Sequence, residues 1–314
     1  MTQPTPQLPA PQVPAPQDAT PQDAGSAPPR RGATARVLTT LGVLLGVVAI
    51  GSGALILVDL AMYETTTQHE TYEPAGSVVL LADGHVTVAA AEGDVEVDAV
   101  AQRGLRGPRY SAQESADRLE ITHRCGWSLI TSPRCSGGLE VTLPADTEVE
   151  VRTANGDVVA SGLAGDLVLS SNNGRVEASE IGGPLTADSD NGDIAVTGAV
   201  GDVRASTANG RVSLVDVDGT VDADSQNGDV VIEAVTGDAS GTTSNGSVEI
   251  TQVDGDVRAR TSNGRVTVVG DRRPVALTIQ TSNGRETVNG PTDPDAARTV
   301  EIRSSNGDVE YIVP

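Results

Sequence analysis

The sequence predicts an all-β fold: a β-solenoid of the β-helix or β-roll type with 18-residue coils, preceded by one transmembrane α-helix and a disordered N-terminal tail. Three observations predict the solenoid. Asn-Gly pairs recur every 18 residues from Asn155 to Asn263, and glycines recur every nine residues from Gly156 to Gly264. Apolar and polar residues alternate between these turns, and an aromatic content of 2% fits a thin core of small side chains.

Each 18-residue unit contains two short strands that have one apolar face. A β-branched residue stands two positions after each Asn-Gly glycine, a further apolar residue follows two positions later, and the second half of the unit repeats the alternation. The first column consists of Val158, Val176, Ile194, Val212, Val230, Val248 and Val266. A single unit cannot bury its apolar face alone, so we expect the units to stack into a solenoid.

The turn residues also form columns. The Asn column consists of Asn155, Asn173, Asn191, Asn209, Asn227, Asn245 and Asn263. We expect it to be a structural ladder at a tight corner, because Asn and Gly tolerate positive φ. A Ser or Thr two residues before each Asn is expected to form hydrogen bonds along the solenoid axis rather than to act in catalysis. After the Asn-Gly pairs, Asp and Arg alternate from Asp157 to Asp229, with Ser247 and Arg265 following, which predicts opposite charges on neighbouring coils.

The region before the solenoid divides into three segments. Residues 1–36 are rich in Pro and Gln and are predicted to be a disordered cytoplasmic tail. Residues 37–60 are predicted to form the transmembrane helix, because the charge-free run from Val37 to Val58 spans roughly 33 Å as a helix. Arginines precede this run and acidic residues follow it, which predicts a single-pass protein of the cell membrane with its N-terminus in the cytoplasm and its C-terminal domain outside. A cleaved signal peptide is the alternative.

Residues 61–76 are expected to be a linker, and residues 77–314 the extracytoplasmic solenoid. An insertion at about residues 102–137 interrupts the opening coils. At the other end, residues 299–314 are expected to form the last edge coil, in which Pro314 denies one hydrogen-bond donor to an incoming strand.

The insertion differs from the rest of the chain in charge, aromatic content and cysteine. Outside the membrane its two cysteines are expected to form a disulfide that closes the loop around the only Trp. A stapled loop of this kind either caps the solenoid or binds a sugar ring or an anionic polymer of the cell envelope. The residues concerned are Cys125 and Cys135 for the disulfide, and Trp127, Arg124, Arg134 and Arg109 for binding.

Several classes of function are disfavoured. A net charge of −22 argues against a nucleic-acid partner. Two Cys and three His are too few for most metal sites, no catalytic serine, zinc-protease or nucleotide-binding motif is present, and no cofactor is expected. Calcium is considered only at Asp254 and Asp256, because Arg replaces Asp on alternate coils.

The segment from Leu139 to Val158 resembles a known family. Its strand–Pro–strand lead-in, LEVTLPADTEVEV, and the recurrent Ser/Thr-x-Asn-Gly-x-Val units are similar to the bacterial putative-adhesin domain, a β-strand-repeat domain of unknown function. The resemblance covers about residues 75–314. It implies a β-repeat fold in a cell-envelope protein and supplies no catalytic residues.

The leading hypothesis is therefore a membrane-anchored, non-catalytic module of the cell envelope, either adhesin-like or structural. Its partners would be the membrane and a cell-wall polymer or another envelope protein. One alternative is an envelope-stress sensor or scaffold that signals through the cytoplasmic tail. Another is a glycan-processing enzyme, which would need a carboxylate pair in a groove beside the insertion.

Overall fold

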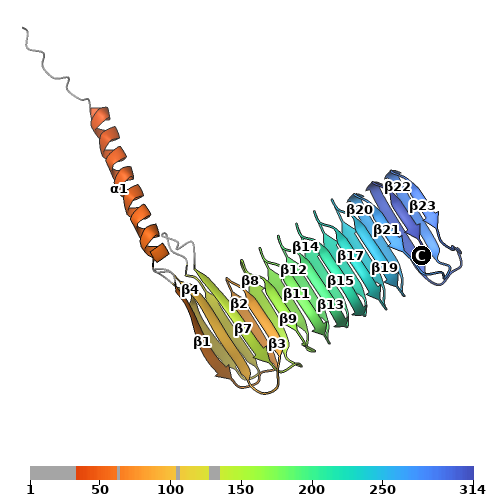
Figure 1. The fold of residues 1–314 in the computed structure, drawn as a ribbon, viewed down its shortest axis with the longest axis horizontal. Helices are drawn as coiled ribbons and strands as arrows, with labels where there is room; N and C mark the ends of the chain where they lie inside the picture. The colour runs from red at the N-terminus through yellow and green to blue at the C-terminus, as the bar shows by residue number, and fades with distance from the viewer. Residues whose placement is uncertain (1–32, 62–63, 104–106, 127–134) are drawn as a thin grey trace, which may run out of the picture. The chain divides into compact units, whose positions relative to one another are not determined.

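The computed structural model describes residues 33–61, 64–103, 107–126 and 135–314 (Figure 1). The chain divides into two compact units, residues 1–53 and 54–314. The expected disordered tail, except for its last residues, lies outside the described residues. One helix, α1, spans Ala33–Ala61.

The expected transmembrane anchor is not supported. Within the described residues, no helix is both long and apolar enough to cross a membrane. The prediction of a single-pass membrane protein over residues 37–60, with the orientation derived from it, is corrected accordingly.

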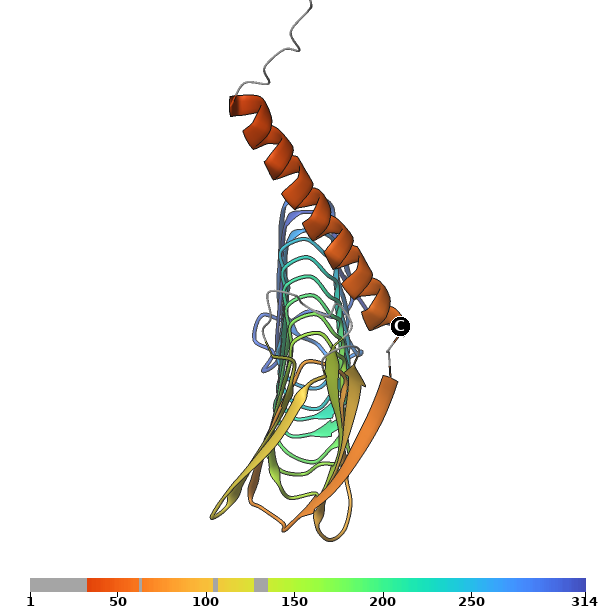
Figure 2. The same ribbon diagram turned by 90° about the vertical axis from the view of Figure 1, so that its left-hand side faces the viewer.

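The rest of the described chain forms two long, mostly parallel sheets that face each other (Figures 1 and 2). The first sheet has the order β1 (Glu64–Tyr72), β4 (Val95–Arg103), β7 (Ser136–Leu143), β3 (Val86–Ala90), β9 (Val158–Ser161), β11 (Val176–Ile181), β13 (Ile194–Val200), β15 (Val212–Asp218), β17 (Val230–Val235), β19 (Val248–Val253), β21 (Val266–Val269), β25 (Val309–Ile312) and β23 (Glu286–Asn289). The second sheet has the order β22 (Ala276–Asn283), β24 (Thr299–Asn306), β20 (Val257–Asn263), β18 (Ala239–Thr243), β16 (Val221–Ser225), β14 (Val203–Thr207), β12 (Leu185–Ser189), β10 (Leu167–Ser171), β8 (Glu148–Thr153), β2 (Ser77–Ala82), β6 (Arg118–Arg124) and β5 (Arg109–Ser115).

The coils stack in register with a period of 18 residues. Val176 pairs with Val158 on one side and with Ile194 on the other, and Leu185 likewise lies between Leu167 and Val203. These residues are buried between the sheets with the other members of their columns. The predicted all-β, solenoid-like architecture is confirmed, and small side chains fill its core.

The N-terminal end departs from the regular coil. The coil made by β2 and β3 lies between the β8–β9 coil and the β6–β7 coil, so the stacking order differs from the chain order. Residues 61–76, expected as a linker, contain β1, which pairs antiparallel with β4. The expected insertion contains the antiparallel β5–β6 hairpin, which extends the second sheet.

The C-terminal end also departs from chain order. Strands β24 and β25 lie inside the stack, and the preceding coil of β22 and β23 lies at its edge, so the expected edge coil at residues 299–314 was wrong. The difference in apolar content explains why β24 and β25, rather than β22 and β23, take the inner position. Val300, Ile302 and Tyr311 of the inner coil are buried, whereas β23 is exposed along its whole length. The coil with more apolar surface takes the position between two neighbours.

Glycine is needed at the Asn-Gly corner because neighbouring coils approach each other closely there. A Cβ atom at Gly192 would collide with the carbonyl group of Gly174, and the same collision recurs at Gly174, Gly210 and Gly228. These residues do not have positive φ. The expectation that glycine is needed there for positive φ was therefore wrong. Glycine is needed because the backbone of the neighbouring coil leaves no space for a Cβ.

A comparison of two glycines tests this explanation. Gly192→Ala should lower the free energy of unfolding by about 2–4 kcal/mol, because backbone atoms cannot yield to the new Cβ. Gly198→Ala is the matched control, since its φ is +69° but the nearest atom to its Cβ would be 3.8 Å away. It should cost about 1–2 kcal/mol. Urea denaturation of both variants measures the difference, and equal losses would contradict close approach as the cause.

Candidate functional site

The Asn column forms a continuous ladder of side-chain amides. From Asn173 to Asn263, each Nδ2 donates to the Oδ1 atom of the Asn one coil earlier, at 2.9 to 3.1 Å. Asn306 then donates to Asn263, and Asn283 donates to Asn306, both at 2.9 Å. The ladder thus follows the stacking order rather than the chain order, and it holds neighbouring coils in register.

The Ser/Thr column is buried beside this ladder. Ser171 Oγ donates to the carbonyl oxygen of Gly156 at 2.9 Å and accepts the N–H of Gly174 at 2.8 Å. The same two bonds recur at Ser189, Thr207 and Ser225. These hydroxyl groups bond to backbone across the coils, which gives them a structural role.

The charged column also bonds to backbone. Asp157 and Asp193 each accept the N–H of the arginine one coil later, Arg175 and Arg211, at 2.8 Å. The ion pairs along the column are exposed, for example Arg175 with Asp193 at 3.6 Å, and contribute little because water screens them. The carboxylates therefore act mainly as acceptors for backbone groups at the corner.

The predicted binding loop lies at the N-terminal end of the solenoid. Cys125 and Cys135 form a disulfide, as expected. Arg109 and Arg124 are brought directly opposite each other on the antiparallel β5–β6 pair, and both are exposed. The other two residues proposed for binding, Trp127 and Arg134, lie outside the described residues. Binding by this loop stays a prediction.

Aromatic and imidazole side chains join the two sheets at this end. The hydroxyl groups of Tyr72, on β1 of the first sheet, and Tyr110, on β5 of the second, are hydrogen-bonded at 2.6 Å. Burial and this bond raise the pKa of Tyr110 above its usual value. The ring of Tyr110 packs edge-on against His123, which is 2% exposed and donates from Nδ1 to the carbonyl oxygen of Gly138 at 2.9 Å. This end of the stack is therefore closed by side chains.

The sequence did not predict a second column, whose residues have positive φ. Positive φ recurs every 18 residues at Gly162, Glu180, Gly198, Asp216, Ala234 and Gln252. Glycine occupies only two of these six positions, so the composition of the column gave little signal. A groove of about 630 Å³ runs beside it, lined in part by the exposed Val200 and by Asp218 and Asp254.

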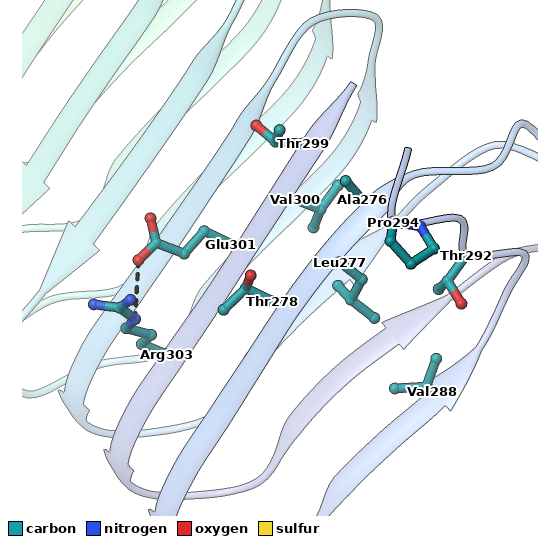
Figure 3. A pocket seen from close by; sticks show the side chains of 10 residues that line it. All are labelled: Ala276, Leu277, Thr278, Val288, Thr292, Pro294, Thr299, Val300, Glu301 and Arg303. Carbon is teal, nitrogen blue, oxygen red and sulfur yellow. Dashed lines mark ion pairs between the residues drawn. The ribbon is translucent and has the colours of Figure 1, made fainter. Parts of the chain in front are cut away.

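The C-terminal end contains an open pocket of about 660 Å³, shown in Figure 3. It lies at the edge strand β22, and Thr292 and Pro294, from the segment after β23, form one side of it. Leu277 and Val288, whose positions on β22 and β23 correspond to buried core residues of inner coils, are only partly covered there, and Val288 is 48% exposed. The lining residues are Ala276, Leu277, Thr278, Val288, Thr292, Pro294, Thr299, Val300, Glu301 and Arg303.

One wall of this pocket carries an ion-pair cluster. Glu301 contacts Arg260 at 2.7 Å, Arg303 at 2.9 Å and Arg258 at 3.1 Å. The hydrogen bond from Arg260 is the main reason why the pKa of Glu301 lies below its usual value. The carboxylate is therefore fixed in its charged form by three guanidinium groups, and it serves to order this wall rather than to transfer protons.

The residues considered for calcium are occupied by the chain itself. Arg273 contacts the Asp254 carboxylate at 2.6 Å, and the N–H of Thr299 donates to Asp256 at 2.7 Å. In the part of the chain that the structure describes, no group of three or more potential metal ligands converges. The described pockets that contain several carboxylates are lined by residues 198–271 and 166–222, away from the insertion that the enzymatic alternative requires.

The repeat architecture matches the family described as Toastrack DUF4097 over residues 78–311. The chain belongs to this family. No curated protein matches it. The Toastrack chain is similar to a putative adhesin from Bacteroides fragilis NCTC 9343, with 13% identity, a TM-score of 0.41 and coverage of 79% of this chain and 97% of that one.

Two other solved structures are similar to the Toastrack chain. A putative lipid binding protein from Parabacteroides distasonis ATCC 8503 has 10% identity and a TM-score of 0.46, with coverage of 79% of this chain and 96% of that one. A putative adhesin from Parabacteroides merdae ATCC 43184 has 14% identity, a TM-score of 0.29 and the same two coverages.

The buried His123 predicts a pH dependence of stability. Burial lowers its pKa, against the opposing hydrogen bond to Gly138 and the charge of Asp83, so the folded protein keeps the imidazole neutral. The unfolded chain takes up a proton first, and stability should therefore fall as the pH decreases below about 6.5. Urea denaturation from about pH 8 to about pH 5 measures this. His123→Gln should reduce the pH dependence, and an unchanged pH dependence in this variant would contradict the assignment.

The facing arginines predict a stabilising substitution. Because like charges opposite each other on antiparallel strands repel, Arg124→Gln should raise the free energy of unfolding by about 0.3–0.5 kcal/mol. The gain should shrink at high salt. Arg118→Gln on the same strand faces Ser115 and is the matched control, which should lack the gain. A loss of stability in Arg124→Gln at low salt would contradict repulsion between these side chains.

Proposed function

We propose that this Toastrack chain is a non-catalytic, adhesin-like binding module that captures an extended polypeptide segment at its open C-terminal end. The segment would add to the second sheet as a further strand beside β22. One observation carries the proposal: β22 is an edge strand of eight residues without a single charged side chain, and it borders an open pocket. Addition of a strand to such an edge is a common mode of peptide recognition.

The other three edge strands are protected against strand addition. Charged side chains on an edge oppose pairing with a further strand. Strand β1 carries two glutamates, β5 carries Arg109 and Glu114, and β23 carries Glu286 within four residues. The sequence of β22, ALTIQTSN, offers no comparable protection.

The backbone of β22 has groups available on its open side. The N–H of Ala276 donates to the carbonyl oxygen of Arg298, toward β24. Because successive residues of a strand point their backbone groups to opposite sides, those of Leu277, Ile279 and Thr281 are directed to the open side. The Thr281 N–H is already bonded to the Glu286 carboxylate at 3.0 Å. Just before the strand, both backbone groups of Val275 are bonded to Pro291 and Asp293. Leu277 and Ile279 therefore provide the open-side N–H groups for an added strand.

The pocket would supply contacts for the side chains of the added strand. Leu277 and Val288 lack the covering coil that buries the corresponding residues elsewhere in the stack, so a segment laid along β22 would remove apolar surface from water. Of the two partner classes expected from the sequence, a protein segment and a wall polymer, this edge favours the protein. Membership of the Toastrack family and the structural role of the serine column support a function without catalysis.

A synthetic peptide tests the open edge. A fluorescein-labelled peptide with the sequence of residues 276–283 should bind the full-length chain saturably, as measured by fluorescence anisotropy. Ile279→Pro removes an open-side N–H and should weaken binding by about ten-fold or more, since loss of about 1.4 kcal/mol already has that effect. Ile279→Val keeps the N–H and the apolar side chain and should bind like the unmodified chain.

Thermal denaturation followed by circular dichroism establishes that each variant is folded. The proposal would be overturned if the unmodified chain failed to bind the peptide, or if folded Ile279→Pro bound it with unchanged affinity.

A further inference from the structure

We infer that Asn283 and Asn289 are sites of spontaneous covalent modification, at which the side-chain amide is lost and a carboxylate takes its place. Both residues lie in the outermost coil, on β22 and β23, and each is followed by glycine. The chain contains ten Asn-Gly pairs, and the other eight lie in coils that have a neighbouring coil on both sides. The stack restrains those eight pairs and leaves these two able to react.

The reaction needs two groups of an Asn-Gly pair to meet. The backbone nitrogen of the glycine attacks Cγ of the asparagine and loses its proton, and the side-chain nitrogen leaves as ammonia. Water then opens the cyclic imide and gives either aspartate or isoaspartate, in which the main chain runs through Cγ. Glycine favours the attack because it has no side chain to obstruct it. Hydrogen bonds that hold the asparagine carbonyl or the glycine N–H in place oppose it.

The side chain of Asn283 lacks a restraint that the rest of the ladder has. From Asn155 to Asn263, and again at Asn306, the Oδ1 atom accepts a hydrogen bond from Nδ2 of the asparagine on the next coil, at 2.9 to 3.1 Å. Asn283 donates to Asn306, but no coil follows to donate to Asn283. Among the described ladder residues it is therefore the one asparagine whose Oδ1 accepts no bond from another.

The glycine after Asn283 is also unrestrained. In the two coils that precede it in the stack, the glycine N–H donates outward to the next coil. That of Gly264 donates to the carbonyl oxygen of Asn306, and that of Gly307 donates to the carbonyl oxygen of Asn283, both at 3.0 Å. By the same geometry the N–H of Gly284 faces away from the stack, where the described chain offers no acceptor. Both reacting groups of this pair are therefore unbonded.

Asn289 lies outside the ladder, at the end of β23. Its backbone carbonyl accepts the N–H of Val313 at 3.1 Å, but its exposed side chain has no hydrogen-bond partner among the described residues. Strands β22 and β23 each pair on one side only. The outermost coil of a stack opens more readily than an interior one, which gives the chain near Asn289 the freedom to close the imide ring.

The product keeps the rest of the ladder. A carboxylate at Asn283 can no longer donate to Asn306, so the terminal bond is lost, while the bonds between the interior asparagines remain. The reaction also adds a negative charge to β22, which has no charged side chain beforehand.

Peptide mapping by mass spectrometry tests the two sites. Asn263 is the matched control, because Thr-Ser-Asn-Gly-Arg surrounds both Asn263 and Asn283, and only the neighbouring coils differ. On incubation of the folded full-length chain in a mildly alkaline buffer, Asn283 and Asn289 should lose their amides about ten-fold or more faster than Asn263. This factor corresponds to about 1.4 kcal/mol of activation free energy, the equivalent of one or two hydrogen bonds.

The same incubation in urea separates the effect of the fold from that of the sequence. In the unfolded chain Asn283 and Asn263 should react at equal rates, since their local sequences are identical. Equal rates in the folded chain, or a difference that persists in urea, would overturn protection by the stack. An amide at Asn289 that lasts as long as that at Asn263 in the folded chain would overturn the assignment of Asn289.

Discussion

The close approach of successive coils at the glycine column is the constraint on which the rest of the solenoid depends. Because Gly192 has no Cβ, its backbone can lie directly against that of Gly174. This close approach brings the Asn, Ser/Thr and Asp/Arg columns within hydrogen-bonding distance of the next coil. The Asn amides bond to one another, the serine hydroxyls bond to glycine carbonyl groups, and the aspartates accept backbone N–H groups. A coil in the interior thus has its polar corner satisfied by its two neighbours.

The same stacking holds a column of residues in a conformation that their side chains disfavour. Glu180, Asp216, Ala234 and Gln252 have φ between 53° and 57°, which costs roughly 1–2 kcal/mol for each residue. The residues after this column, such as Ile181 and Val217, are buried in register with those of the neighbouring coils. The bend that turns these side chains inward is therefore imposed by the stack, which outweighs local preference.

Periodicity made the interior predictable and left the ends unpredictable. The columns that begin at Val158 and Asn155 predict the strands and the corner directly, because each residue has the same environment as the equivalent residue one coil earlier. The position of Tyr311 inside the stack depends on a comparison between two whole coils, since either of them has a sequence that fits the register. Positive φ at Ala234 gave no signal because alanine rarely adopts it. The helix expected over residues 37–60 is present, but its assignment as a membrane span rested on the length of the charge-free run.

These differences also explain where a candidate site can arise in a solenoid. An interior coil has no spare edge, and its polar corner groups are already bonded to neighbouring coils, so recognition of an extended segment is confined to the first and last coils. At the N-terminal end, Tyr72, Tyr110 and the charged strands β1 and β5 close the stack. At the other end the more apolar coil has moved inward, and the coil left at the edge is polar enough to remain exposed yet carries no charge on β22. The exchange of the last two coils therefore both completes the core and creates the open edge.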